Sequence, residues 1–217
     1  MTGHGRLVAW LALVLTQAAI NYGDRAAGGK PPKDVLYHYS TAAAGLVLYG
    51  IVLGLVLLIA AGAKPRRLLA LRPPLSWGRA AGGALVVLIG IFALLRILDP
   101  FLHPGREQGL TPSGWDSSRA GAYAANFAVI ALAAPIVEEL TFRGLGFSLL
   151  ERFGRPAAIM LVGIAFGLAH GLIEALPVLA AFGAGLAWLR ARTESVYPSI
   201  ALHAAFNAIA LTLAVTT

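Results

Sequence analysis

The 217-residue sequence contains no cysteine and few charged residues. Without cysteine, the chain can have no disulfide framework, no thiolate metal site and no cysteine nucleophile. Only 12% of its residues are charged and 58% are hydrophobic, whereas a soluble globular domain has about a quarter of its residues charged. The composition is therefore typical of an integral membrane protein.

Two protease signatures are also missing. The sequence has no HExxH stretch, so the usual zinc-binding helix of the zincins is excluded. Ser148, in GLGFSLL, lies in no nucleophile-elbow pattern and has no evident histidine base. Serine and zincin chemistry are thus poor interpretations of this chain.

Seven apolar segments approach the length of about 20 residues that a membrane-spanning helix needs. They predict an all-α, polytopic membrane bundle of about seven transmembrane helices that forms one integrated domain. The segments are 7–22, 41–63, 80–98, about 120–150, 156–172, 174–190 and 198–216. Segment 7–22 also has the basic start of a signal peptide, but no clean small-x-small cleavage site follows, so we expect a retained helix.

The chain has 17 Lys and Arg residues against 10 Asp and Glu residues, a net charge of +7. Its basic residues gather in the connections at 64–79, 152–155 and 190–192. This pattern encodes orientation in a bilayer rather than nucleic-acid binding. Abundant arginine, alanine and glycine suggest a GC-rich bacterial genome. We therefore expect a multi-pass protein of the bacterial cytoplasmic membrane, with its N-terminus inside and no nucleic-acid partner.

A few strongly polar residues interrupt the apolar segments of the C-terminal half. A charged side chain in hydrocarbon costs about 2.5–3.5 kcal/mol, so such residues face a bundle interior or a wet cavity. Each has a structural alternative, such as an ion pair or a histidine bonded to a neighbouring helix, but their occurrence together indicates a functional site. They are Glu138, Glu139 and Arg143 in the fourth segment, His170 in the fifth, and His203 and Asn207 in the seventh.

Helical geometry separates the two glutamates. Glu139 and Arg143 are four residues apart and can pair, whereas Glu138 is rotated by about 100° from Glu139 and has no evident local partner. Pro135 removes a backbone donor and can bend the helix just before them. In the fifth segment a glycine recurs every four residues (163, 167 and 171), which predicts a surface for close helix packing.

This set permits two hydrolytic schemes. In one, Arg143 holds Glu139 charged and leaves Glu138 as the base that activates water. A histidine then orients the water, and a histidine–asparagine pair donates hydrogen bonds to the oxyanion. In the other, Glu138, His170 and His203 ligate a catalytic divalent metal, most simply zinc, with one open position. Both schemes stay open at this point.

Three motifs, in this order, resemble those of a known family. EELTFR (138–143), FGLAH (166–170) and HAAFN (203–207) match EExxxR, FxxxH and HxxxN. The chain thus resembles the CAAX prenyl protease and bacteriocin-processing (CPBP) family, also called the Abi or type II CAAX protease family of intramembrane endopeptidases. The resemblance covers residues 120–217, whereas residues 1–119 carry no family motif and contribute spans only.

The resemblance implies a membrane bundle that cleaves peptide bonds at a site open toward the cytoplasmic leaflet. Its partners would be the bilayer and a peptide or protein substrate, membrane-associated or lipidated. Family members are described both as metalloproteases and as metal-free, glutamate-dependent enzymes. The resemblance implies that Glu138 is the base or a metal ligand and that His170 assists it. His203 and Asn207 would bind the oxyanion, or His203 would instead bind the metal. Glu139 and Arg143 would support these residues.

Two other functions are compatible with the same residues. A non-catalytic bacteriocin-immunity or scaffolding protein would keep the fold without using the glutamate as a base. A transporter would also bury charge within its spans, although the sequence has no detectable inverted repeat, which many transporters contain.

Overall fold

The computed structural model of the chain describes residues 2–29, 34–98, 100–102, 107, 112 and 114–216. Within these ranges the chain is helical and has no strand, which confirms the predicted all-α class. The helical elements are α1 (Gly3–Ala26), η1 (Val35–Tyr37), α2 (Tyr39–Ala60), α3 (Pro65–Leu68), α4 (Trp77–Leu98), η2 (Ser117–Arg119), α6 (Ala120–Ala128), η3 (Val129–Ala133), α7 (Ala134–Glu139), η4 (Leu140–Gly146), α8 (Phe147–Leu150), η5 (Glu151–Phe153), α9 (Arg155–Ala169), α10 (Leu176–Thr193) and α11 (Tyr197–Thr216).

Five helical segments among the described residues are long and apolar enough to cross a membrane, so the predicted number of seven is not confirmed. They are α1, α2, α4, the continuous stretch Ser117–Phe153 and α11. Helices also form at the fifth and sixth predicted spans. However, α9 has only 15 residues, about 22 Å of helix against a hydrocarbon thickness of about 30 Å, and α10 ends in a turn that contains Arg190 and Arg192.

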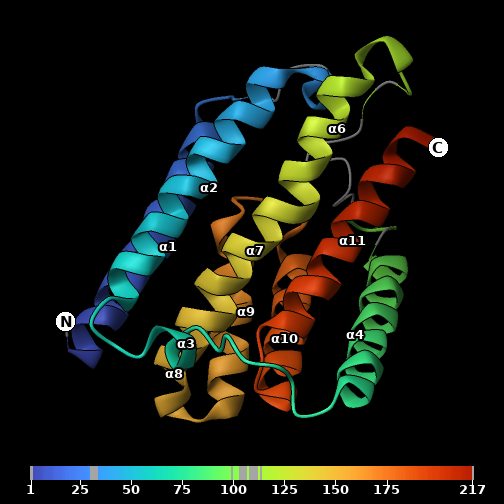
Figure 1. Cartoon of the computed structure of the whole chain (residues 1–217). Coiled ribbons are helices and arrows are strands. Elements are labelled where there is room, and N and C mark those ends of the chain that lie inside the picture. The colour runs from blue at the N-terminus through green and yellow to red at the C-terminus, as the bar shows by residue number, and fades with distance from the viewer. Residues whose placement is uncertain are drawn as a thin grey trace.

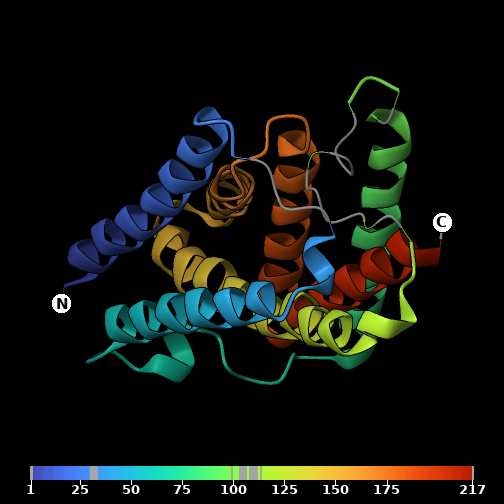
Figure 2. The same cartoon turned by 90° about the horizontal axis from the view of Figure 1, so that it is seen from above.

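The helices form a bundle with α1 and α2 on one side and α4 on the other (Figures 1 and 2). Helix α4 packs against α10 and α11, and α10 packs along α9. The stretch Ser117–Phe153 runs from the end of the bundle where α2 begins to the end that carries α8 (Figure 1). Its middle part contacts α2, α9, α10 and α11, so polar residues there lie inside the bundle.

Helix α1 packs into this bundle along its length. Trp10 is buried, and its indole nitrogen donates to the carbonyl oxygen of Thr141 at 2.9 Å. Toward the other end of α1, Asn21 donates to the carbonyl oxygen of Ala169 at 2.7 Å. These contacts tie both ends of α1 to the rest of the bundle.

Glycines bring α9 close to α10. A Cβ at Gly163 would lie 2.7 Å from the backbone nitrogen of Ala184, and one at Gly167 would lie 3.0 Å from that of Ala180. The predicted packing surface is therefore confirmed at these two positions. Gly171 lies instead beyond the end of α9 with a φ of +66°, a conformation that glycine adopts at little cost.

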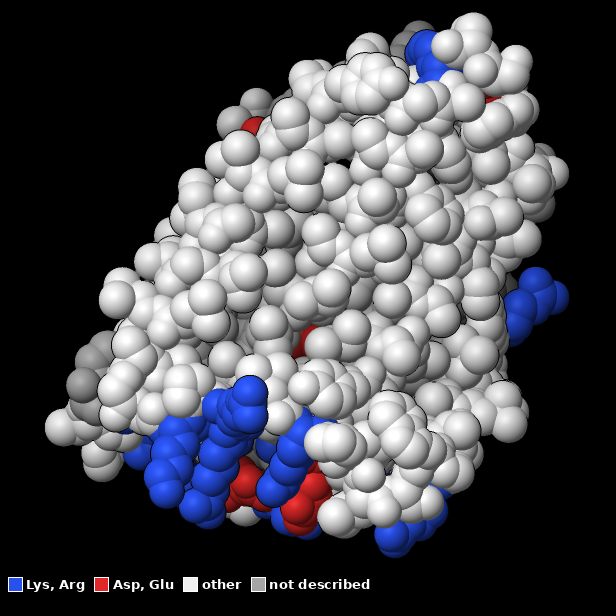
Figure 3. Space-filling model, in the orientation of Figure 1, with Lys and Arg blue, Asp and Glu red and all other residues white. Residues whose placement is uncertain are grey.

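Lysine and arginine side chains gather at one end of the molecule (Figure 3). We call this the basic end. Arg66 and Arg67 lie there on α3, and Arg72 pairs with Glu194, just after α10, at 2.7 Å. One basic end is the distribution expected from the basic connections in the sequence; the side of the membrane that it faces stays a prediction.

Candidate active site

Glu138 and Glu139 end α7, between two π-helical segments of one continuous helix. The first, η3, precedes Pro135, and the second, η4, begins directly after Glu139. Such π segments inside α-helices are frequent at functional sites. The two carboxylates have different surroundings. Glu139 is fully buried, whereas 12% of the side-chain surface of Glu138 is accessible to solvent.

Arg143 pairs with Glu139, as the four-residue spacing predicts. Its Nη1 lies 2.8 Å from Glu139 Oε1, and both side chains are fully buried. Its Nη2 donates to the carbonyl oxygen of Gly183 on α10 at 3.0 Å. The guanidinium also lies over the ring of Phe166 on α9, 4.3 Å from the centroid. The ion pair therefore connects three helices.

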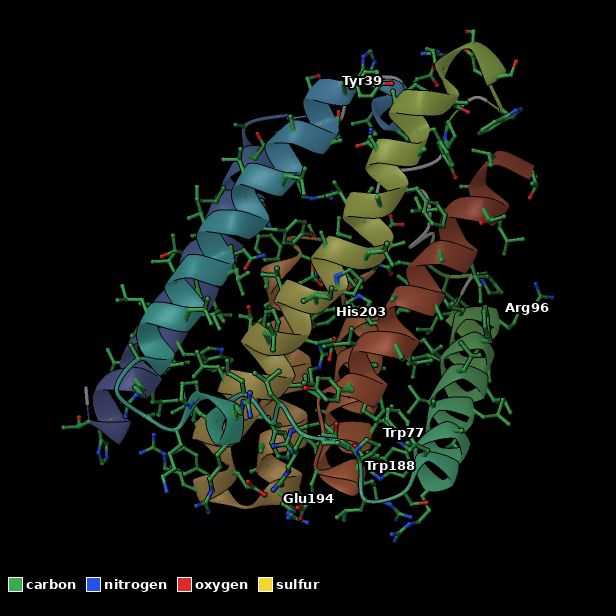
Figure 4. All side chains as sticks on the ribbon, viewed as in Figure 1. Tyr39, Trp77, Arg96, Trp188, Glu194 and His203 are labelled. Atoms are coloured by element: carbon green, nitrogen blue, oxygen red, sulfur yellow. The ribbon has the colours of Figure 1, made fainter. Side chains whose placement is uncertain are left out.

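His203 lies in the second turn of α11, inside the bundle (Figure 4), and its two ring nitrogens face the two glutamates. Its Nδ1 is 2.9 Å from Glu139 Oε1; because a carboxylate only accepts, this nitrogen carries a hydrogen. Its Nε2 lies 3.8 Å from Glu138 Oε2, too far for a direct hydrogen bond. The buried ring is held by edge-on contacts with Phe166 and Phe182.

Glu138 has a second neighbour that sequence analysis missed. The hydroxyl of Tyr49, on α2, donates to Glu138 Oε1 at 2.9 Å. Between residues 42 and 60 Tyr49 is the single polar side chain of an otherwise apolar helix, and this was the available signal. Glu138, which has no evident partner in the sequence, therefore lies between α2 and α11.

His170 directly follows α9 instead of lying within it as predicted. Its Nδ1 is 2.7 Å from the carbonyl oxygen of Phe166. Because a carbonyl only accepts, Nδ1 carries the hydrogen, and Nε2 is left as an acceptor in the neutral ring. The ring of Phe166 contacts both His170 and His203, with centroid distances of 4.5 and 5.7 Å. One buried phenylalanine thus positions both histidines.

Asn207 makes its hydrogen bond to the backbone of η3. Its Nδ2 donates to the carbonyl oxygen of Ile130 at 2.9 Å. In η3 the amide of Ala134 bonds to the carbonyl of Val129, five residues back. The next bond in this pattern would join Pro135 to Ile130, and proline has no N–H. Asn207 therefore supplies the donor that Pro135 removes, and it ties α11 to η3.

Four of the six predicted site residues line a cavity of about 600 Å³. Glu138, His170, His203 and Asn207 line it, whereas Glu139 and Arg143 lie buried behind the wall. Along α11 the lining continues from His203 to Ala214, away from the basic end. The other lining residues are Tyr49, Ile130, Ala134, Phe166, Leu172, Leu179, Phe182, Phe206, Ala210, Leu211 and Leu213.

The scheme in which Glu138, His170 and His203 ligate zinc stays a prediction. Among the described residues, no group of three His, Asp or Glu side chains is placed to hold a metal ion. Glu138 and His203 approach each other to 3.8 Å. The hydrogen bonds that fix the rings of His170 and His203 both use Nδ1, which is also the usual arrangement in histidines that bind a metal through Nε2.

Comparison with known proteins agrees with the resemblance seen in the motifs. No curated protein and no solved structure gives a significant match to the chain. Residues 120–209 match the family model described as type II CAAX prenyl endopeptidase Rce1-like. This segment contains all three motifs and every polar residue of the cavity wall except Tyr49. With five apolar helices long enough to span a membrane among its described residues, the chain is an integral membrane protein whose residues 120–209 are similar to the type II CAAX prenyl endopeptidase family of proteases.

Proposed function

We propose that the chain hydrolyses a peptide bond inside the bundle and that Glu138 activates the attacking water. The observation that carries the proposal is the position of Glu138, whose carboxylate lies on the cavity wall between Tyr49 and His203. Glu139 is a poor candidate for the base, because it is fully buried and bonded to both Arg143 and His203. Its role is to hold His203.

The charges of this cluster balance in pairs. The positive charge of Arg143 offsets the negative charge of Glu139. Glu138 and His203 together have no net charge when they share one proton in addition to the hydrogen on Nδ1 of His203. An uncompensated buried charge is costly, and the proposed reaction needs an ionised carboxylate as its base, so we propose that this shared proton is on Nε2 of His203. Its Nε2–H is then available in the 3.8 Å gap to Glu138.

In the reaction, Glu138 takes a proton from water, and the oxygen of that water bonds to the substrate's carbonyl carbon. Negative charge develops on the carbonyl oxygen, which accepts a hydrogen bond from His203 Nε2. His170, whose Nε2 is an acceptor, orients the water. Glu138 then gives its proton to the leaving nitrogen as the C–N bond breaks. Asn207 contributes by keeping α11, and with it His203, in place against η3.

We propose a membrane-associated or lipidated peptide as the substrate. The name of the matched family model specifies a prenyl endopeptidase acting on CAAX sequences, and most of the cavity wall is apolar. His203 lies on the part of α11 nearer the basic end, and we propose that this end faces the cytoplasm because cytoplasmic connections carry the excess of Lys and Arg. The reaction then takes place in the inner half of the bilayer, with the cavity extending toward the outer half.

The test is cleavage by purified protein in liposomes. The probes are internally quenched peptides that end in a farnesylated CAAX sequence, beside the same peptides without the farnesyl group. We expect cleavage by the wild type and at least a roughly 100-fold lower kcat in Glu138→Gln, since general base catalysis contributes about 10²–10⁴-fold. Glu151→Gln, which changes a glutamate that pairs with Arg155 at the surface, is the matched control.

An inactive wild type, or equal rates in wild type and Glu138→Gln, would contradict the proposal. A partner-binding or protective phenotype that survives Glu138→Gln would instead favour the non-catalytic immunity or scaffolding role.

A further inference from the structure

One hydroxyl on the cavity wall comes from outside the segment that matches the family. It belongs to Tyr49, near the middle of α2. Tyrosine in membrane helices is enriched at the two ends, where its hydroxyl reaches the interface. A tyrosine at mid-helix among apolar residues has to find a partner inside the protein, and here that partner is Glu138.

Close packing of α2 against η3 brings Tyr49 to this position. Gly45 lies one helical turn before Tyr49, and a Cβ at Gly45 would come 3.0 Å from Cγ1 of Val129. Helix α2 therefore lies tightly against η3, the segment that leads into the glutamates. The Tyr49 hydroxyl donates a hydrogen bond to Oε1 of Glu138 at 2.9 Å. The other oxygen, Oε2, lies 3.8 Å from Nε2 of His203.

We propose that Tyr49 is a positioning residue that fixes the rotamer of Glu138. With Oε1 held, Oε2 is the oxygen that takes the proton of water beside His203. A glutamate side chain otherwise populates several rotamers, and misplacement of a reacting group by about 1 Å can lower a rate about 100-fold. The phenol is neutral, so it restrains Glu138 without disturbing the charge balance of the cluster. This inference rests on the proposed endopeptidase activity.

The first experiment compares Tyr49→Phe with the wild type on the farnesylated quenched peptide that the wild type cleaves. The substitution keeps the ring and removes only the hydroxyl. A hydrogen bond to a charged group contributes enough that its loss lowers a rate roughly 10- to 100-fold, so we expect kcat to fall by that factor while KM stays within about twofold. The control is Tyr123→Phe, which removes another buried hydroxyl, bonded to the carbonyl of Leu211 at 2.7 Å, and leaves kcat unchanged.

The second experiment tests whether Tyr49 acts through Glu138. Glu138→Asp shortens the side chain by one methylene, so the carboxylate moves out of reach of the Tyr49 hydroxyl. In this background, Tyr49→Phe is expected to cause no further loss of kcat, because coupled residues have non-additive effects. Scanning fluorimetry of each purified variant confirms that it is folded.

The outcomes separate this inference from the proposed function. Full kcat in Tyr49→Phe alongside an inactive Glu138→Gln overturns the positioning role alone, as does a rise in KM with kcat unchanged, which indicates a substrate contact. Equal losses from Tyr49→Phe in the wild-type and Glu138→Asp backgrounds also overturn it, since the tyrosine would then act independently. An inactive wild type would contradict the proposed function, and the positioning role would be contradicted as well.

Discussion

The ring of His203 is held at Nδ1 by Oε1 of Glu139, at 2.9 Å. The same carboxylate oxygen lies 2.8 Å from Nη1 of Arg143, so one atom joins the ion pair to the residue that approaches Glu138. In the proposed reaction the second glutamate of the EE pair therefore acts through His203, because its own side chain is fully buried. Changes to the buried ion pair are expected to affect stability first.

We expect Glu139→Gln and Arg143→Met to lower the free energy of unfolding by about 3–5 kcal/mol each, because each leaves a buried charge without its partner. The double variant is expected to recover most of this loss. Within the described part of the chain, Glu139 Oε2 and Arg143 Nε have no hydrogen-bond partner, so the pair is incompletely compensated. Denaturant titration in detergent measures all three values. A double variant as unstable as the sum of the single ones would contradict this account.

Asn207→Ala is expected to lower the free energy of unfolding by about 1–3 kcal/mol, because the carbonyl of Ile130 is left without a donor. Pro135→Ala restores the backbone N–H that proline lacks, and this N–H can donate to the carbonyl of Ile130. We therefore expect the combination Pro135→Ala/Asn207→Ala to be more stable than Asn207→Ala alone, as measured by thermal unfolding. If Asn207 also binds the oxyanion, kcat will stay low in the double variant despite the recovered stability.

Gly163→Ala is expected to destabilise the bundle by about 1–3 kcal/mol, the usual cost of overpacking. The new Cβ would lie 2.7 Å from the nitrogen of Ala184, which is backbone and cannot rotate away. Separation of α9 from α10 would also move Phe166 and lower kcat. The control is Gly90→Ala on α4, where a Cβ meets nothing within 4 Å. Equal melting temperatures for the two variants would show that this helix contact is looser than described.

Peptide cleavage is expected to continue in the presence of a chelator. The reason is that every step of the proposed reaction is carried by Glu138, His170 and His203 themselves, with no metal ion in it. The measurement is the cleavage rate before and after prolonged treatment with EDTA and 1,10-phenanthroline, with metal analysis of the same samples. Loss of activity with recovery on added zinc would establish the alternative, in which Glu138, His170 and His203 move together around a metal.

The basic end is expected to face the cytoplasm, because cytoplasmic connections carry the excess of Lys and Arg. The chain has no cysteine of its own, so single cysteines report their positions without background. On intact bacterial cells, a membrane-impermeant maleimide should label Ser117→Cys at the far end and leave Ala61→Cys at the basic end unlabelled. The opposite labelling would reverse the orientation and place the reaction in the outer half of the bilayer.

Local spacing along the chain correctly predicted several features. The Glu139–Arg143 pair follows from helical geometry over one turn, and the separation of Glu138 from Glu139 follows from the rotation between neighbours. Both depend only on the helix in which the residues lie. The motifs likewise identified His170, His203 and Asn207 as one set, and all three line the cavity together with Glu138.

The partners of these residues could not be predicted in the same way. Tyr49 is 89 positions from Glu138 along the chain, and Ile130 is 77 positions from Asn207. No local rule relates such residues, because their distance depends on how closely the helices pack and on the π segments before and after α7. The number of seven spanning helices was not confirmed among the described residues, since apolar composition does not distinguish a full span from a shorter helix buried against its neighbours.

The sequence by itself determined that the chain is a helical membrane protein, which residues are too polar for lipid, and which of them share a helix face. These properties are set by composition and by the fixed geometry of one helix. Only the tertiary structure decided that Glu139 holds His203 while Glu138 lies on the cavity wall beside Tyr49. The physical reason is that contacts between helices depend on side-chain volume and backbone approach, as at Gly45 and Gly163, and these act across segments that are distant in the chain.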